Sequence, residues 1–308
     1  MPSAAAGRSM LRAVRRLGAV HQVLQQRGPR WVVNTRPATT SAEPVEKFRK
    51  DYAPPPFTVP AVDLCFVLGV GEQPTAVTCT LVVQRSRSAT PDSVLRLDGE
   101  NIVLRSVYVD GRLLSRGTDF EVDESCLTIL PPAIPNSSTF SVKTHSETKP
   151  HENFQLSGLY KSSGMFCTQC EAEGFRRIAY HYDRPDIMAK YKVRIEADAA
   201  ENPVLLSNGN KVAEGVLPGG MHYTEWEDPW PKPSYLFALV AGNLGVLRDK
   251  FTTMSGREVQ LAIYSEHDKI DQCHHSMLSL KQSMEWDEKV FGLEYDLDIF
   301  NIVAVSDL

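Results

Sequence analysis

The sequence predicts a mainly β fold in which antiparallel sheets pack together, followed by a shorter α/β segment. Short segments of alternating apolar and polar residues recur between residues 76 and 264, and turn residues separate them. Only one long segment, close to the C-terminus, has the period of an α-helix. Strands at this close spacing, with no helices between them, are typical of packed antiparallel sheets.

The β region follows an extended lead-in at Pro54-Pro55-Pro56, a run that cannot continue a helix. Asp110-Gly111 lies between two apolar segments and predicts a hairpin, because both residues accept the positive φ of a tight turn. Asn208-Gly209-Asn210 and Pro218-Gly219-Gly220 predict further turns. The predicted strands are residues 76–83, 93–97, 102–109, 126–130, 140–144, 178–182, 191–197, 222–227 and 235–244.

The α/β segment begins near residue 244, with strands predicted at 251–254 and 259–264. Asp268 is the predicted N-cap of a long helix, and Gly292 is expected to end that helix in a left-handed conformation. A buried strand is predicted at 299–305, which leaves this domain incomplete in the sequence. The predicted buried stripe of the helix is Ile270, Cys273, Met277, Leu280, Met284 and Phe291.

Charge is divided unevenly along the 308 residues, whose net charge is −5. Residues 1–42 hold seven arginines and no acidic residue, so the rest of the chain carries −12. An Arg-rich, acid-free, amphipathic N-terminus is typical of an organellar transit peptide, and residues 1–45 are interpreted as a transit peptide and linker. The alternatives are a disordered basic tail and a surface helix on anionic lipid. We expect a mitochondrial destination, with the plastid as the alternative.

The composition excludes two classes of protein. No run approaches the ~20 apolar residues of a membrane-spanning helix, so no transmembrane segment is predicted. The mild acidity argues against a nucleic-acid partner, which usually requires a basic surface.

Few residue patterns indicate chemistry. Cys167 and Cys170 have the spacing of metal ligands, but no second pair accompanies them, so the cysteines are interpreted as ordinary reduced thiols. His151-Glu152 begins like a zinc-protease helix, but Gln155 stands where a second histidine is required. The adjacent His274 and His275 are interpreted as surface residues.

The segment between Phe166 and Phe175 is different, because it places Gln169, Glu171 and Glu173 between aromatic residues. Carboxylates in a semi-apolar loop could bind a substrate ammonium, since a partly desolvated ion pair is stronger than one in water. The alternative is a solvated acidic turn.

Six longer motifs follow one another in the chain. They are Phe166-Cys-Thr-Gln-Cys-Glu-Ala-Glu-Gly-Phe-Arg-Arg, Asp183-Arg-Pro-Asp-Ile-Met-Ala-Lys-Tyr191, Leu206-Ser-Asn-Gly-Asn210, Asp228-Pro-Trp-Pro-Lys-Pro233, Ala238-Leu-Val-Ala-Gly-Asn243 and Phe291-Gly-Leu-Glu-Tyr-Asp-Leu-Asp298.

This series closely resembles the N-terminal part of the bacterial and organellar aminopeptidase N (alanyl aminopeptidase) family of gluzincin zinc metallopeptidases, over roughly residues 45–306. The resemblance implies a β-saddle domain at 46–243 and the incomplete beginning of a thermolysin-like catalytic domain at 244–308. It also implies that Glu171 binds the free α-amino group of a peptide and that Gln169 lines the first side-chain pocket.

The family's zinc site has no counterpart in this sequence. The His-Glu-x-x-His motif and the Gly-Ala-Met-Glu-Asn motif are both absent. We therefore expect no catalytic residues, no metal ligands and no bound zinc in this chain, and no peptide hydrolysis by it alone. The sequence is interpreted as the N-terminal part of a zinc aminopeptidase that would pair with the missing catalytic domain. The alternative is a non-catalytic module that binds peptide N-termini.

Overall fold

The computed structural model describes residue 46 and residues 48–304. The described residues fall into two units, with the boundary between Ala53 and Pro54. In the first unit, the described residues form the 3₁₀ turn η1 (Arg49–Asp51), whereas the predicted transit peptide at 1–45 lies outside the described residues. None of the helices in the described part of the chain is long and apolar enough to cross a bilayer.

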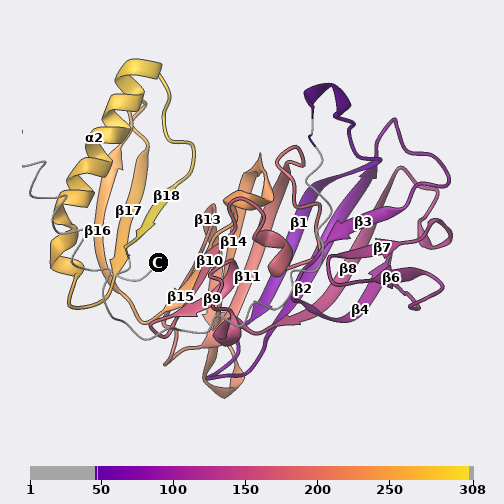
Figure 1. Ribbon diagram of the computed structural model, residues 1–308. Helices are drawn as coiled ribbons and strands as arrows, with labels where there is room; N and C mark the ends of the chain where they lie inside the picture. The colour runs from indigo at the N-terminus through magenta and orange to yellow at the C-terminus, as the bar shows by residue number, and fades with distance from the viewer. Residues whose placement is uncertain (1–45, 47, 305–308) are drawn as a thin grey trace, which may run out of the picture. The chain divides into compact units, whose positions relative to one another are not determined.

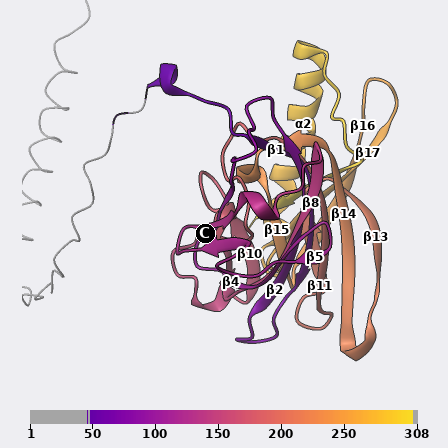
Figure 2. The same cartoon turned by 90° about the vertical axis from the view of Figure 1, so that its right-hand side faces the viewer.

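A large sheet of eight strands dominates the second unit (Figure 1). Its strands are β1 (Phe57–Val67), β2 (Thr75–Arg85), β4 (Val103–Val109), β5 (Arg112–Leu113), β8 (Thr139–Thr148), β11 (Ala189–Asp198), β13 (Asn210–Val216) and β14 (Met221–Lys232). They lie in the order β13-β14-β11-β1-β2-β8-β4-β5. Figure 2 shows β13 and β14 as a long two-stranded ribbon at one edge.

Two smaller sheets share the hydrophobic core of the large one. One has the order β3-β7-β6, and the other has the order β12-β15-β10-β9. Their strands are β3 (Leu95–Asp98), β6 (Phe120–Val122), β7 (Cys126–Ile129), β9 (Gly158–Ser162), β10 (Met165–Gln169), β12 (Val204–Ser207) and β15 (Leu239–Gly242). The mainly β architecture predicted from the sequence is therefore confirmed.

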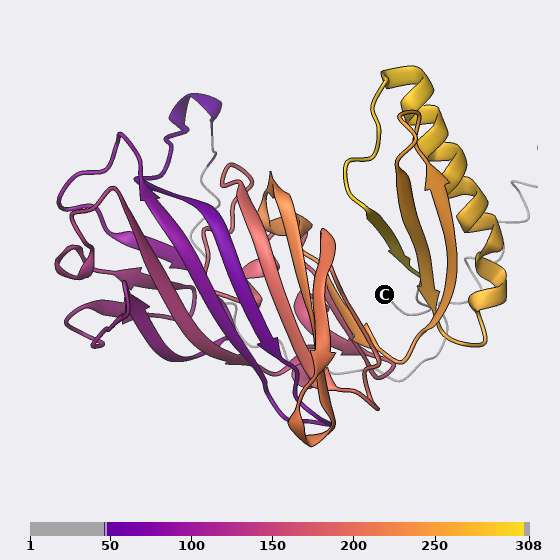
Figure 3. The same ribbon diagram turned by 180° about the vertical axis from the view of Figure 1, so that it is seen from behind.

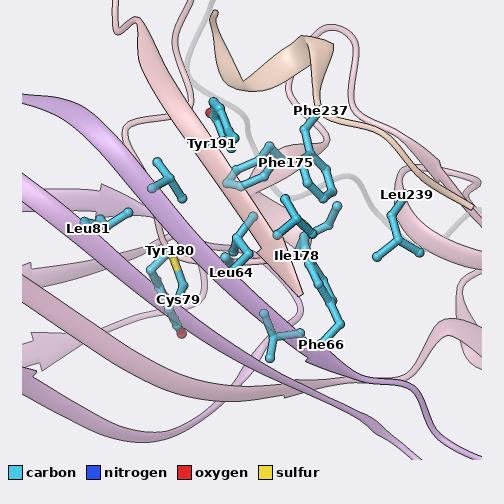
Figure 4. Close-up of a cluster of buried hydrophobic side chains, with 14 of the residues drawn as sticks. Leu64, Phe66, Cys79, Leu81, Phe175, Ile178, Tyr180, Tyr191, Phe237 and Leu239 are labelled. Atoms are coloured by element: carbon cyan, nitrogen blue, oxygen red, sulfur yellow. The ribbon is translucent and has the colours of Figure 1, made fainter. Parts of the chain in front are cut away.

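Aromatic rings fill the core between these sheets (Figure 4). The ring of Phe237 lies 5.3 Å from that of Phe175, 6.0 Å from that of Phe66 and 6.2 Å from that of Tyr191. All four side chains are buried. Burying an aromatic or aliphatic side chain of this size contributes about 1.5–3 kcal/mol, so this cluster is a main source of stability for the β region.

The predicted Asp-Gly hairpin is confirmed. Asp110 has φ 46° and Gly111 has φ 79°, and they connect β4 to β5. Positive φ at both central residues is the geometry that the twist of the flanking strands requires.

Strand β1 was not predicted, although it is central to the large sheet. Its burial alternates, as in a half-buried strand, but Pro60 interrupts the sequence pattern. The pairing with β2 shifts register between Thr58 and Ala61, which accommodates the missing proline donor. β1 also runs parallel to β11, so the expectation of antiparallel pairing holds for every pair in this sheet except this one.

Three predicted strands are wrong. The strand predicted at 251–254 shares only its first two residues with the observed strand, which runs from Gly245 to Thr252. Residues 178–182 follow the 3₁₀ turn η4 (Phe175–Arg177), and His181 alone pairs, through a single bridge to Asp98. All five residues are buried, so the segment is apolar without being a strand. The segment 235–244 begins instead with the 3₁₀ turn η6 (Ser234–Leu236), and only its second half forms β15.

The C-terminal part forms a third small sheet with one helix, as Figure 3 shows from behind. The strands are β16 (Gly245–Thr252), β17 (Glu258–Ser265) and β18 (Ile299–Val303), and the helix α2 (His274–Phe291) follows the 3₁₀ turn η7 (Ile270–Cys273). Between the helix and the sheet lies a separate hydrophobic cluster made of Val259, Leu261, Ile263, Cys273, Met277, Leu280 and Met284.

Of the two predicted helix ends, the C-terminal one is confirmed and the N-terminal one is wrong. Gly292 ends α2 at φ 66°, and its amide donates to the carbonyl oxygen of Glu288 over 3.0 Å, which confirms the C-cap. Asp268 does not cap α2, because the η7 turn comes first and no side chain caps the helix. Phe291 is 60% exposed and packs against Trp286, so it does not belong to the buried stripe.

One buried histidine has consequences for stability. His181 is fully buried, and its Nδ1 lies 2.7 Å from the carbonyl oxygen of Tyr182, so Nδ1 carries the hydrogen. Its Nε2 has no hydrogen-bond partner among the described residues. Burial lowers the pKa of His181 to about 4, because a charged ring would leave water without gaining an acceptor.

We expect this histidine to make folding stability depend on pH. The pKa is about 4 in the folded chain and 6.5 in the unfolded reference, so the unfolded state binds the proton first as pH falls. The contribution of neutral His181 to folding stability is therefore fully present above about pH 6.5, and it is lost as the pH falls from there to about pH 4. Urea unfolding of wild type and His181→Gln should show the difference in unfolding free energy shrinking by about 2–3 kcal/mol from about pH 7.5 to about pH 4.5.

The control is His275→Gln, which replaces an exposed histidine on α2. Its difference from wild type should stay constant over the same range. A constant difference for His181→Gln as well would contradict the assignment.

Candidate functional site

The two residues predicted to bind substrate lie at the start of one short loop. Gln169 is the last residue of β10, and the loop runs from Cys170 to Gly174 before η4 begins. The side-chain amide of Gln169 donates from Nε2 to the backbone oxygen of Glu171 over 3.2 Å. The peptide bond between Glu171 and Ala172 is cis. The structure therefore brings Gln169 and Glu171 together.

The expected semi-apolar surroundings of these residues are not found. Gln169, Glu171 and Glu173 are all exposed, because the flanking Phe166 and Phe175 point into the core and are almost fully buried. The expectation that these carboxylates are partly desolvated, and bind an ammonium more strongly for that reason, is therefore wrong for the described residues. An ion pair between an exposed carboxylate and an ammonium contributes only about 0.2–1 kcal/mol.

The two carboxylates in the loop differ in their partners. Glu173 lies 3.6 Å from Nη2 of Arg176, which offsets its charge. The carboxylate of Glu171 has no ion-pair or hydrogen-bond partner among residues 48–304. Of the two, Glu171 is thus the acceptor that is free to take a ligand.

The N-terminal side of the loop is anchored to β15. The hydroxyl of Thr168 accepts a hydrogen bond from the Leu239 amide over 2.8 Å, and it donates to the Leu239 carbonyl oxygen over 3.3 Å. Cys170 is buried immediately beyond Gln169. The exposed side chains therefore project from a backbone that is fixed beneath them.

Close backbone contacts shape the loop itself. The Gly174 amide donates to the Cys170 carbonyl oxygen over 2.8 Å and closes the turn. A Cβ atom on Gly174 would lie 2.3 Å from the carbonyl oxygen of Gln169 and 2.9 Å from Cα of Cys170. No residue other than glycine fits this position without moving the backbone of the predicted site.

A buried carboxylate holds the C-terminal side of the loop. Oδ2 of Asp183 accepts hydrogen bonds from the Arg176 amide over 3.1 Å and from Arg176 Nε over 3.0 Å. Oδ1 of Asp183 accepts the Ser234 hydroxyl over 2.6 Å. The Asp183 amide in turn donates to Oδ2 of Asp98 over 3.0 Å.

Glu100 strengthens this arrangement from the other side. Its amide donates to the Arg176 carbonyl oxygen over 2.9 Å, and its carboxylate lies 3.3 Å from Nη2 of Arg177. Arg177 also donates to the side chain of Gln155. Both arginines of η4 are therefore engaged.

The cysteines beside the loop are not reactive groups. Cys167 and Cys170 are free and buried, and burial raises the pKa of both thiols, which keeps them protonated. The other four cysteines are also free, which agrees with their interpretation as thiols. His274 and His275 are exposed, as predicted.

Zinc, which the resemblance implies for the whole family, does not fit the described residues. Residues 46 and 48–304 contain no group of three His, Cys, Asp or Glu side chains placed to hold a metal ion. No chemical step that involves a metal is therefore assigned to them.

Comparison with known proteins identifies the family. The model of the peptidase M1 N-terminal domain matches residues 78–236, which is about half of the chain. The chain belongs to the peptidase M1 family. The match contains the loop, its anchors Thr168 and Asp183, and the partner Ser234.

Curated M1 relatives are aminopeptidases by name. The chain is 48% identical to aminopeptidase N of Escherichia coli over 86% of its own length, and 49% identical to aminopeptidase N of Caulobacter vibrioides over 83%. It covers 29% of each of these relatives. Among solved structures, aminopeptidase A of Legionella pneumophila in complex with aspartic acid matches with a TM-score of 0.76 at 36% identity, over 82% of this chain and 29% of that one.

The M1 assignment confirms the family that the sequence motifs resemble. The roles of Gln169 and Glu171 stay predictions, as do the domain limits 1–45, 46–243 and 244–308. Sequence reasoning did not find the anchors of the loop. Asp183 and Arg184 begin the motif at residues 183–191, but the motif does not reveal the contacts that Asp183 makes with Arg176 and Ser234.

We expect Gly174→Ala to destabilise the protein by about 1–3 kcal/mol, because the new Cβ meets backbone atoms that cannot rotate away. Urea unfolding measures the change. The matched control is Gly245→Ala, whose Cβ would meet its nearest atom at 3.4 Å, an ordinary contact. The control should lie within about 1 kcal/mol of wild type. Equal stability of Gly174→Ala and the control would contradict the tight packing of the loop.

Proposed function

We propose that this chain supplies the part of a zinc-dependent M1 aminopeptidase that recognises the free N-terminus of a peptide. The carboxylate of Glu171 accepts hydrogen bonds from the α-ammonium group, and Gln169 lines the pocket for the first side chain. The partners are thus peptide N-termini. Membership of the M1 family and the names of the relatives support the reaction class.

The observation that carries the proposal is an unpartnered carboxylate on an anchored loop. Glu171 has no partner among residues 48–304, whereas the loop beneath it is fixed through Thr168 on one side and Arg176 on the other. An ammonium group offers three N–H donors, and an ionised carboxylate is an acceptor only. A fixed acceptor of this kind favours a free amine over an acylated or internal peptide nitrogen.

The related structure from Legionella supports the class of ligand. That aminopeptidase A is in complex with aspartic acid, a free amino acid that bears an α-ammonium group. We infer that the chain described here binds the same group at the N-terminus of its peptide.

The hydrolytic step belongs to groups beyond those described here. The family resemblance supports the zinc dependence that we propose for the whole enzyme, while the described residues offer no ligand set for the metal. Because the chain spans 29% of its aminopeptidase N relatives, we propose that it acts together with an M1 catalytic domain. That domain would supply the zinc ligands and the hydrolytic groups that the described residues do not offer.

We expect this chain to prefer a peptide with a free amino group over its N-acetylated form by about two- to fivefold, as a single exposed ion pair allows. The measurement is a nuclear magnetic resonance titration of the labelled protein with trialanine amide and with its N-acetylated form. In Glu171→Gln the preference should vanish, because the neutral amide no longer attracts the ammonium.

Glu173→Gln is the matched control, since it removes an exposed carboxylate two residues away whose charge Arg176 already offsets. The control should keep the preference of the wild type. If Glu171→Gln keeps it too, Glu171 is not the amine anchor.

We also propose that residues 1–45 direct the chain to mitochondria. The seven arginines, the missing acidic residues before position 43 and the amphipathic pattern support an import signal. Fused to a fluorescent protein, residues 1–45 should give a mitochondrial signal, and the same segment with the arginines replaced by glutamine should lose it. A plastid or diffuse signal from the unchanged segment would contradict the destination.

A further inference from the structure

We propose that Asp183 is a positioning residue that holds the amine-binding loop in place, an inference that rests on the proposed function of Glu171. Asp183 does not touch the predicted substrate. Instead, its carboxylate joins the loop to the segment that begins at Ser234.

The carboxylate of Asp183 is surrounded by donors. Oδ2 accepts two hydrogen bonds from Arg176, one from the backbone and one from the guanidinium group, and Oδ1 accepts the hydroxyl of Ser234. The side chain of Asp183 is 1% exposed, and that of Arg176 is 15% exposed. A buried carboxylate needs such donors, since an unpaired charge in the interior is costly.

The bond to the Arg176 amide acts directly on the loop. Arg176 lies two residues after Gly174, whose own amide closes the turn on Cys170. Phe175, between them, is fully buried against the rings of Phe237 and His181. Fixing the backbone at Arg176 thus fixes the end of the loop on which Glu171 stands.

Both ends of the loop are tied to one short segment, residues 234–239. Ser234 holds the C-terminal end through Asp183 and Arg176, and Leu239 holds the N-terminal end through the hydroxyl of Thr168. This segment comprises η6 and the first residue of β15. Of the two links between the loop and residues 234–239, the one through Asp183 includes an ion pair with Arg176, which an uncharged amide would not reproduce. An asparagine can turn its oxygen to Arg176 and its NH₂ group to the hydroxyl oxygen of Ser234, but it leaves the guanidinium group without the charge of Asp183.

The test is local hydrogen exchange of the full chain, wild type against Asp183→Asn. We expect exchange at the amides of Gly174 and Arg176 to become at least about tenfold faster, because the loop opens without global unfolding. Amides in the centre of the large sheet, such as those of β1 and β2, should keep their rates. The preference for trialanine amide over its N-acetylated form should also be lost, although Glu171 is still present.

The control is Asp198→Asn, which removes a carboxylate that accepts the amides of Ala200 and Glu201, both over 2.9 Å, in the turn after β11. This variant should leave both the exchange of the loop and the amine preference unchanged. If Asp183→Asn does not fold, Ser234→Ala provides the test. It removes one donor and keeps Arg176 bound, so exchange at Arg176 should rise by about two- to tenfold.

Unchanged exchange at Gly174 and Arg176, or an equal rise throughout the sheet, would overturn the positioning role. An absent amine preference in the wild type would instead overturn the function of Glu171. The two failures are therefore distinguishable.

Discussion

The arrangement of the described chain depends on the pairing of β1 with strands on both of its sides. β1 is the only link between β2 and β11 in the order of the large sheet, so the sheet would separate into two halves without it. Its inward side chains, Leu64 and Phe66, are also fully buried in the shared core. Hydrogen bonding across β1 therefore joins the N-terminal strand β2 to β11, which begins more than 100 residues after β1 ends and follows the loop 170–174 in the chain.

The same core connects the sheet to the loop. Phe66 projects from β1 and stacks on Phe237 at 6.0 Å, and Phe237 meets Phe175 at 5.3 Å. Phe175 directly follows Gly174, so the packing of Phe175 in the core fixes how far the loop lies from the core. Hydrogen bonds then set its direction, through Thr168 on one side and Asp183 on the other. Packing alone leaves a backbone some freedom, whereas donor and acceptor geometry restricts it further.

The sequence contained most of the information for elements with local signals and little for those fixed by distant contacts. The Asp110-Gly111 hairpin and the Gly292 cap were predicted because their backbone angles require particular residues. β1 was not predicted because Pro60 interrupts its alternating pattern. Residues 178–182 were predicted to be a strand because a buried irregular segment is as apolar as a buried strand. For the site, the carboxylates between aromatic residues suggested an ammonium-binding loop, and the family resemblance then singled out Gln169 and Glu171. Nothing local could indicate that Phe166 and Phe175 turn inward and leave both side chains exposed.

Because Glu171 is exposed, the position of its carboxylate and the strength of its attraction for an ammonium group have different origins. At 4 Å, two unit charges attract with about 1 kcal/mol in water and about 4 kcal/mol near a protein surface from which water is partly excluded. The loop already has its fixed geometry in the described residues, because every anchor lies within residues 98–239. The attraction, by contrast, grows only when something covers the carboxylate. An M1 catalytic domain packed over this loop would raise the affinity for an ammonium without moving Glu171, since it would lower the local dielectric and confine the peptide. Under the proposed function, recognition of the amine would thus have two sources, with the geometry supplied by this chain and the strength supplied by the catalytic domain that we propose as its partner.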